Sequence, residues 1–109
     1  MSLQVVFLAS AEQDLKELRS YIVGQFGAAT WQTSYSKIKA AVNGLQNFPL
    51  SGTLPAELAS LNLTQYRQVM VDANRIIYEI RDDRLYIHVV CDSRKELKAL
   101  LTRRLLRTP

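Results

Sequence analysis

The chain has 109 residues, 48% of them hydrophobic and 22% charged, a composition typical of one globular domain and unlike that of a disordered chain. A single cysteine excludes an internal disulfide framework and a multi-cysteine zinc site, and no apolar run approaches the roughly 20 residues of a membrane span. The formal charge is +4, and the excess of basic side chains lies between residues 92 and 109.

The N-terminal residues Met1–Gln4 show no basic segment or long apolar stretch typical of a secretory signal. We therefore expect a cytoplasmic protein with a single domain over residues 1–109. A localised basic end indicates a polyanionic or acidic partner, either nucleic acid or an acidic protein segment. The alternative is a solvated helix face that keeps a small protein soluble.

The first predicted element is a strand over Gln4–Ala9, a short run of apolar and β-branched residues. It ends at Ser10–Gln13, whose Ser-x-x-Gln spacing fits a capping box at a helix N-terminus. Glu12 and Asp14 then lie where acidic side chains suit the helix dipole. The helix that follows carries one apolar stripe at three- and four-residue spacing, formed by Ala11, Leu15, Leu18, Ile22 and Phe26.

A second helix is predicted after Gly27, which interrupts the first stripe. Its apolar positions are Trp31, Tyr35, Ile38, Val42 and Leu45. Because only about three residues around Gly27 join the two helices, they should fold back as an antiparallel hairpin. Aromatic side chains at helical spacing belong to a core more often than to a cofactor site, so Trp31 and Tyr35 are expected to pack there.

Three strands are predicted in the second half of the chain. Phe48–Pro55 is rich in Pro and Gly and ends the helical half, and Ala56–Leu63 fits a loop with one short helical turn. The strand-like runs are Gln65–Val71, Asn74–Arg81 and Arg84–Cys91. Short polar breaks separate them, so an antiparallel meander is expected. Alternation in the last run predicts one face with Leu85, Ile87, Val89 and Cys91, and another with Arg84, Tyr86 and His88.

A last helix is predicted from Ser93, because Ser93–Glu96 forms a second capping box. Its leucines fall in an arc of about 140° at roughly 100° per residue, and Arg104 is the one charge inside that arc. The element order is therefore β-α-α-β-β-β-α. This is an α+β fold in which an antiparallel sheet packs on the helical hairpin, with a C-terminal helix. The hairpin should cover one face of the sheet and leave the other partly open.

Few residues favour metal or covalent chemistry. His88 and Cys91 are the only soft metal ligands, and their spacing in a strand predicts that they point to opposite faces, so no metal or cofactor is expected. The glycines are isolated and form no phosphate-binding loop. Glu57 and Glu79 are the carboxylates that could act as a base, although their spacing does not require it.

Arginines form the remaining pattern: Arg67, Arg75, Arg81 and Arg84 on the strands, and Arg94 just after them. On an open sheet face, guanidinium groups grip phosphates bidentately, as an RNA-cleaving site requires. The alternative is that edge and outward-facing strand positions favour charge. The residues alone leave both interpretations open.

Several segments resemble the ParE/RelE toxin superfamily, in the right order and over nearly the whole chain. They are Leu15–Ile22 with Ala11 and Asp14, Asn47–Gly52, Tyr66–Val69 and Asn74–Ile80. The ending, Asp92–Leu97 with Arg103–Leu106, resembles the ParE branch in particular. The resemblance implies the fold that the periodicity predicts.

The resemblance also implies the toxin of a bacterial type II toxin–antitoxin system, neutralised by an extended, partly disordered antitoxin segment in a hetero-oligomer. RelE-like members cleave messenger RNA on the ribosome, whereas ParE-like members poison DNA gyrase. The nuclease branch usually places a His-Arg pair after the last strand and a tyrosine near the C-terminus. Here Cys91–Arg94 offers only the arginine, and no tyrosine follows Tyr86, so a gyrase inhibitor without catalytic residues is favoured.

The two branches assign different residues. A gyrase inhibitor would contact its target or antitoxin through the basic end and an apolar groove beside the hairpin, using Arg94, Lys98, Arg103, Arg104, Arg107 and Tyr35. The alternative, a ribosome-dependent mRNA endoribonuclease, would hold the phosphate with Arg67, Arg75 and Arg94 and move protons with Glu57 or His88. A third hypothesis is a toxin homologue that has lost activity and persists as a binding module.

Overall fold

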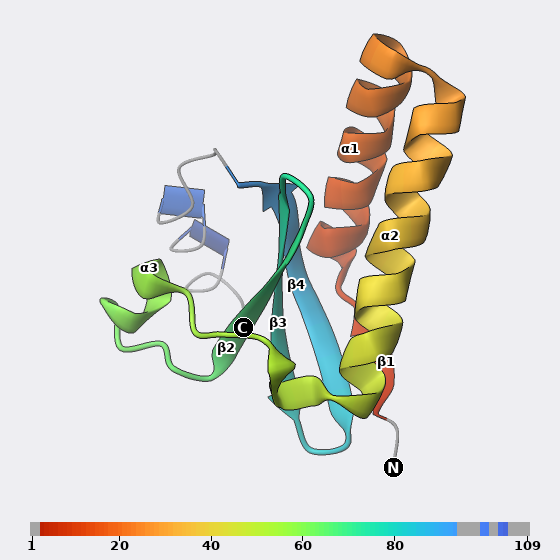
Figure 1. The fold of residues 1–109 in the computed structure, drawn as a ribbon. Helices are drawn as coiled ribbons and strands as arrows, with labels where there is room; N and C mark the ends of the chain where they lie inside the picture. The colour runs from red at the N-terminus through yellow and green to blue at the C-terminus, as the bar shows by residue number, and fades with distance from the viewer. Residues whose placement is uncertain (1–2, 94–98, 101–102, 105–109) are drawn as a thin grey trace.

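Four strands form one sheet with the order β1-β4-β3-β2 (Figure 1). The computed structural model describes residues 3–93, 99–100 and 103–104. The strands are β1 (Gln4–Phe7), β2 (Tyr66–Val71), β3 (Asn74–Arg81) and β4 (Arg84–Asp92). The last three pair antiparallel, which confirms the predicted meander. Its two tight turns place Asp72 and Asp82 at φ values of 53° and 58°, which Asp tolerates better than most residues.

The first strand differs from its prediction in direction and length. β1 pairs with β4 in parallel, so the sheet is mixed, and the expectation of a wholly antiparallel sheet is wrong for this strand. The strand also ends at Phe7 rather than Ala9. The error has a simple cause, because the pattern of residue types identifies a strand but carries no information about its direction.

The helices α1 (Ala9–Phe26) and α2 (Ala28–Asn47) form the predicted hairpin. Gly27 joins them with φ of 96°, a conformation that glycine adopts without strain. The capping box predicted at Ser10 is wrong, since Leu8 is the N-cap and no side chain caps the helix. Ser10 lies in the first turn, where its hydroxyl donates to the carbonyl oxygen of His88 at 3.5 Å. The Ser10 side chain, which was expected to cap the helix, therefore bonds to the sheet instead.

The hairpin covers one face of the sheet and buries the main core there (Figure 1). Its buried members are Ala11, Ile38, Val42, Leu45, Val71, Ile76, Tyr78, Leu85, Ile87 and Val90. The hairpin extends past the sheet at its Gly27 end, and Phe26 there is 64% exposed despite its place in the first stripe. Tyr35 lies at the margin of the second stripe and is 40% exposed, so its predicted core role is wrong. It stacks instead on the half-buried Trp31.

A bulge in β4 changes the faces predicted for that strand. Tyr78 lies opposite Ile87 and Ile77 lies opposite Val89, so His88 has no partner on β3. A bulge adds one residue to a strand and interrupts its strict alternation of side chains. The sequence pattern gave no signal for the extra residue, because every position from 87 to 91 except one is apolar.

Two buried clusters on opposite faces result from this bulge. Leu85 and Ile87 belong to the main core, whereas Val89 and Cys91 belong to a second cluster, so the predicted common face of these four residues is wrong. The buried members of the second cluster are Leu58, Tyr66, Ile77, Val89 and Cys91. His88 contacts the Tyr66 ring of this cluster, which places it on the same face as Cys91 rather than on the opposite one.

The second face of the sheet is more covered than predicted. The chain between α2 and β2 forms η1 (Pro49–Ser51) and α3 (Ala56–Ala59), which agrees with the loop and single helical turn expected there. Leu58 of α3 is fully buried in the second cluster, and Leu61, Leu63 and Leu100 pack against it.

The C-terminal helix is described only in part. Residues 99–100 and 103–104 are helical. The predicted positions from Arg94 to Lys98, and Leu101 and Leu105, lie outside the described residues. Within the part of the chain that is described, no helix combines the length and the apolar character that a bilayer span requires.

Tyr78 attaches the loop after α2 to the sheet. Its hydroxyl donates to the carbonyl oxygen of Pro49 at 2.7 Å and accepts from the amide of Gly52 at 3.0 Å. Arg67 Nη1 donates to the carbonyl oxygen of Gly52 at 2.8 Å. Gly52 has no room for a side chain, because a Cβ would collide with the Tyr78 hydroxyl and lie 2.7 Å from the carbonyl oxygen of Gln68.

We therefore expect Gly52→Ala to lower the free energy of unfolding by roughly 1–3 kcal/mol through overpacking. Gly24→Ala is the matched control, because a Cβ on Gly24 in the last turn of α1 meets nothing within 4 Å. It should raise stability by about 0.5–1 kcal/mol through helix propensity. Urea unfolding of both variants measures the difference, and equal effects would contradict the crowding at Gly52.

Candidate functional site

The arginines of the predicted nuclease set lie on different faces of the sheet. Arg67 is opposite Tyr78 of the main core, and its Nη1 donates to the carbonyl oxygens of Leu50 and Gly52 at 3.2 and 2.8 Å. Arg75 is opposite Cys91 of the second cluster. The sheet therefore separates the two guanidinium groups that one phosphate would need together, and Arg94 lies outside the described residues.

Glu57 and Arg75 are the pair from this set that the structure brings together. Arg75 Nη1 donates to Glu57 Oε2 at 3.0 Å and to Gln68 Oε1 at 3.3 Å. Both charged side chains are about a quarter exposed, at 21% for Arg75 and 28% for Glu57. Their contact ties α3 to the sheet.

His88 and Glu79 form a buried pair, which the exposed Arg81 joins at its edge. Glu79 Oε1 lies 2.9 Å from His88 Nε2 and accepts from Arg81 Nη2 at 2.8 Å. Burial lowers the pKa of His88, although Glu79 opposes that shift. Burial raises the pKa of Glu79, but the hydrogen bonds from Arg81 and His88 outweigh it and leave the pKa below its ordinary value. A neutral His88 therefore donates its Nε2 proton to an ionised Glu79.

The Tyr66 ring meets the His88 ring edge-on at 5.1 Å between centroids. His88 is only 6% exposed, and its ring contacts Glu79 and Tyr66 within the protein. This arrangement is that of a satisfied core histidine.

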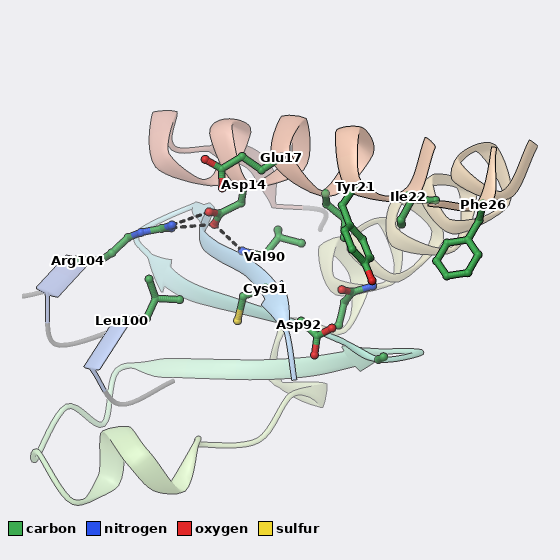
Figure 2. Close-up of a pocket in the computed structure, with 13 residues that line it drawn as sticks. Asp14, Glu17, Tyr21, Ile22, Phe26, Val90, Cys91, Asp92, Leu100 and Arg104 are labelled. Carbon is green, nitrogen blue, oxygen red and sulfur yellow. Dashed lines mark hydrogen bonds and ion pairs between the residues drawn. The ribbon is translucent and has the colours of Figure 1, made fainter. Parts of the chain in front are cut away.

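A groove of about 640 Å³ runs along α1 and is a candidate binding site (Figure 2). We call it the acidic groove. One wall is α1, and the other comes from the turn between β2 and β3, the end of β4, and the C-terminal residues Leu100 and Arg104. Its charged lining residues are Asp14, Glu17, Asp92 and Arg104.

Asp14 is the best-connected residue of this groove. Its carboxylate is almost fully buried, with Oδ2 accepting from the amide of Val90 at 2.9 Å and from Arg104 Nη1 at 2.7 Å. Oδ1 accepts from Arg104 Nη2 at 2.5 Å, which makes the pair bidentate (Figure 2). The hydrogen bond with Asp14 raises the pKa of Arg104. One carboxylate thus connects α1, β4 and the C-terminal helical segment.

One feature of the sequence indicated the Asp14–Arg104 contact but was not used to predict it. Arg104 is the one charge in the apolar arc of the predicted last helix, and a charge at such a position usually has a partner. Asp14 was assigned only to the helix dipole. The two residues are 90 positions apart, so no local pattern could pair them.

The opposite end of the acidic groove is aromatic and exposed. Figure 2 shows Tyr21, Ile22 and Phe26 at one end and Arg104 beside Asp14 at the other. Tyr21 is 56% exposed and Phe26 is 64% exposed, and their rings meet edge-on with centroids 6.4 Å apart. A ligand that fits this groove must therefore present apolar surface at one end and polar groups at the other.

The predicted binding residues are only partly placed by the structure. Arg104 lines the acidic groove, and Arg103 beside it is exposed. Tyr35 lines a separate groove between α1 and α2. Arg94, Lys98 and Arg107 lie outside the described residues. Among the residues that are described, no three His, Cys, Asp or Glu side chains gather as a metal site.

The chain is similar to solved toxin–antitoxin structures. A chain of the chromosomal ParDE toxin–antitoxin system from P. aeruginosa superposes with a TM-score of 0.70 at 14% identity, covering 84% of this chain and 96% of that one. A chain of the RelBE2 toxin–antitoxin complex from Mycobacterium tuberculosis gives a TM-score of 0.58 at 20% identity, covering 84% and 99%. At these identities the similarity shows a common fold.

The sequence itself points to one branch. No curated protein sequence matches the chain. The model of one family, the ParE toxin of the type II toxin–antitoxin system parDE, matches residues 5–97. That range includes the four strands except Gln4, the hairpin and most of the acidic groove. The chain therefore belongs to the ParE family of type II toxin–antitoxin toxins.

Proposed function

We propose that this chain arrests growth by inhibiting DNA gyrase and that a cognate antitoxin neutralises it by binding in the acidic groove. Family membership supports the gyrase target, because ParE-like toxins poison gyrase. The observation that carries the choice over the nuclease is the placement of Arg67 and Arg75 on opposite faces of the sheet. Each arginine is engaged by its own fold contacts.

The proton-transfer candidates also support a toxin that binds rather than cleaves. His88 is buried against Glu79, and Glu57 is paired with Arg75. A general base must reach the proton that it removes, and a histidine with almost no exposed surface is poorly placed to reach a substrate. The basic C-terminal residues, with Arg103 exposed among them, remain the proposed contact to the target.

The acidic groove suits an extended amphipathic antitoxin segment. The apolar side chains of such a segment would cover Tyr21 and Phe26, which leave aromatic surface exposed at the end of the groove. Aromatic anchors in such pockets dominate many interfaces, whereas exposed charged pairs at the rim contribute little. A segment that orders on binding can follow a groove of this length along α1.

The target is tested by supplying the purified chain to two reactions. Supercoiling by DNA gyrase should be inhibited at micromolar toxin, and gyrase–DNA cleavage complexes should accumulate. Messenger RNA on translating ribosomes should stay intact at the same concentration. Cleaved messenger with unaffected supercoiling would overturn the gyrase proposal and favour the RelE-type nuclease. Lack of either effect from folded protein would favour a binding module without toxicity.

For the antitoxin, we expect Phe26→Ala to weaken binding by about 2 kcal/mol, roughly thirtyfold in Kd, because it removes an aromatic anchor of the acidic groove. Phe48→Ala is the matched control. Phe48 is 71% exposed, and it follows the far end of α2 from Gly27. Calorimetric titration of both variants with the antitoxin measures the difference. Equal weakening by the two variants would show that the antitoxin does not depend on this groove.

A further inference from the structure

The loop that follows α2 exposes several large apolar side chains. We call residues Phe48–Leu54 the apolar loop, and residues 40–56 around it include no charged side chain. Phe48 and Leu50 are 71% and 67% exposed, and Leu54 is 40% exposed. Figure 1 shows the loop at the end of the hairpin opposite the Gly27 turn. Isolated apolar side chains are normal on a protein surface, whereas a group of them in one short segment indicates an interaction surface.

The apolar loop packs its small residues inward. Gly52 is buried against the Tyr78 hydroxyl, and Pro55, the residue after the loop, is fully buried. Backbone polar groups face the sheet as well, because the amide of Thr53 donates to the Gln68 carbonyl oxygen at 3.0 Å and its carbonyl oxygen accepts from the Gln68 amide at 2.7 Å. These contacts fill the inward side of the loop, and its larger apolar side chains are left outside.

Side chains of the sheet hold the apolar loop in place. The Tyr78 hydroxyl bonds to Pro49 and Gly52. Arg67 Nη1 donates to the carbonyl oxygens of Leu50 and Gly52. A surface that is already ordered loses little conformational freedom when a partner covers it. The exposed side chains of the loop are therefore presented on a preformed backbone.

The charges around the apolar loop distinguish between kinds of partner. Arg67 contacts the loop, and among the described residues it has no carboxylate partner. Nucleic acid requires several cations for its phosphates, and the loop itself contains none. A symmetric dimer through the loop would bring two Arg67 guanidinium groups into one interface. An apolar pocket with a carboxylate at its rim, on another protein, fits both the exposed side chains and the cation beside them.

The target contact needs an apolar anchor in addition to the basic C-terminal residues. Exposed ion pairs contribute little to affinity, whereas a few large side chains in pockets dominate most interfaces. The aromatic end of the acidic groove is distant, because Phe26 and Phe48 lie beyond opposite ends of α2, whose 20 residues span about 30 Å. No residue of the apolar loop is among those that line the acidic groove. The loop therefore offers an anchor outside the proposed antitoxin site.

We propose that the apolar loop is the anchor by which this chain binds its target enzyme, an inference that rests on the proposed inhibition of DNA gyrase. Phe48 and Leu50 enter an apolar pocket of the enzyme, and a carboxylate at the rim of that pocket pairs with Arg67. The charge pair fixes the orientation, and the buried side chains determine the affinity.

The experiment measures supercoiling by purified gyrase over a range of toxin concentrations. The double variant Phe48→Ala with Leu50→Ala should need roughly thirtyfold more toxin than wild type for half-inhibition, as expected for the loss of anchor side chains. Val23→Ala is the matched control, because it also removes exposed apolar surface, but from the last turn of α1 beside Gly27. It should leave the half-inhibitory concentration unchanged.

Antitoxin binding separates a lost anchor from a general defect. The double variant should bind the antitoxin with wild-type affinity in a calorimetric titration, because its changes lie outside the acidic groove. A misfolded chain would lose both partners, and urea unfolding of the double variant identifies that case. The more conservative variant Phe48→Leu then keeps the fold and should still weaken inhibition.

Four results would overturn the proposal. Wild-type toxin that leaves supercoiling unaffected would overturn both the gyrase proposal and this inference. Inhibition by the folded double variant at the wild-type concentration would overturn the inference alone. Equal weakening of gyrase inhibition and antitoxin binding in the folded double variant would contradict an anchor for the target. A dimer of the wild-type chain in sedimentation that dissociates in the double variant would show that a second copy covers the loop.

Discussion

The Asp14 carboxylate connects parts of the fold that are far apart in sequence. It is almost fully buried, and burial of a carboxylate is costly unless its oxygens are hydrogen-bonded. Here they accept from the Val90 amide on β4 and twice from Arg104. The hairpin, the last strand and the C-terminal segment are thereby held around one charge. Because Asp14 also lines the acidic groove, the same contact that stabilises the fold shapes the proposed antitoxin site.

The bulge at His88 determines which surfaces are left for recognition. It sends Ile87 to the main core and Val89 to the second cluster, so both faces of the sheet carry buried apolar side chains. His88 itself is held by Glu79, with Arg81 on the same carboxylate oxygen. With both faces packed, the grooves described here lie along the flanks of α1 rather than on an open sheet.

Local patterns predicted the elements well and their contacts poorly. Periodicity identified the hairpin around Gly27 and the meander, because helices and strands repeat at fixed intervals. It failed where a contact from elsewhere in the fold decides the outcome, as at Ser10, which bonds to the sheet instead of capping α1. The bulge was invisible in a run of apolar residues. The acidic groove was missed because the Asp14–Arg104 pair joins residues at opposite ends of the chain.

The central claim is that this pair couples the C-terminal segment to the rest of the fold, and a double-mutant cycle tests it most directly. Asp14→Asn and Arg104→Gln are made singly and together, and the free energy of unfolding is measured with urea. The account predicts strong non-additivity, with a coupling free energy of about 1–3 kcal/mol between the two sites. The double variant should be hardly less stable than the less stable of the two single variants. The control cycle of Asp83→Asn with Arg104→Gln should be additive, because Asp83 precedes β4 whereas Arg104 and Asp14 meet near its other end, at Val90. Additivity within about 0.5 kcal/mol in the Asp14 cycle would contradict the claim.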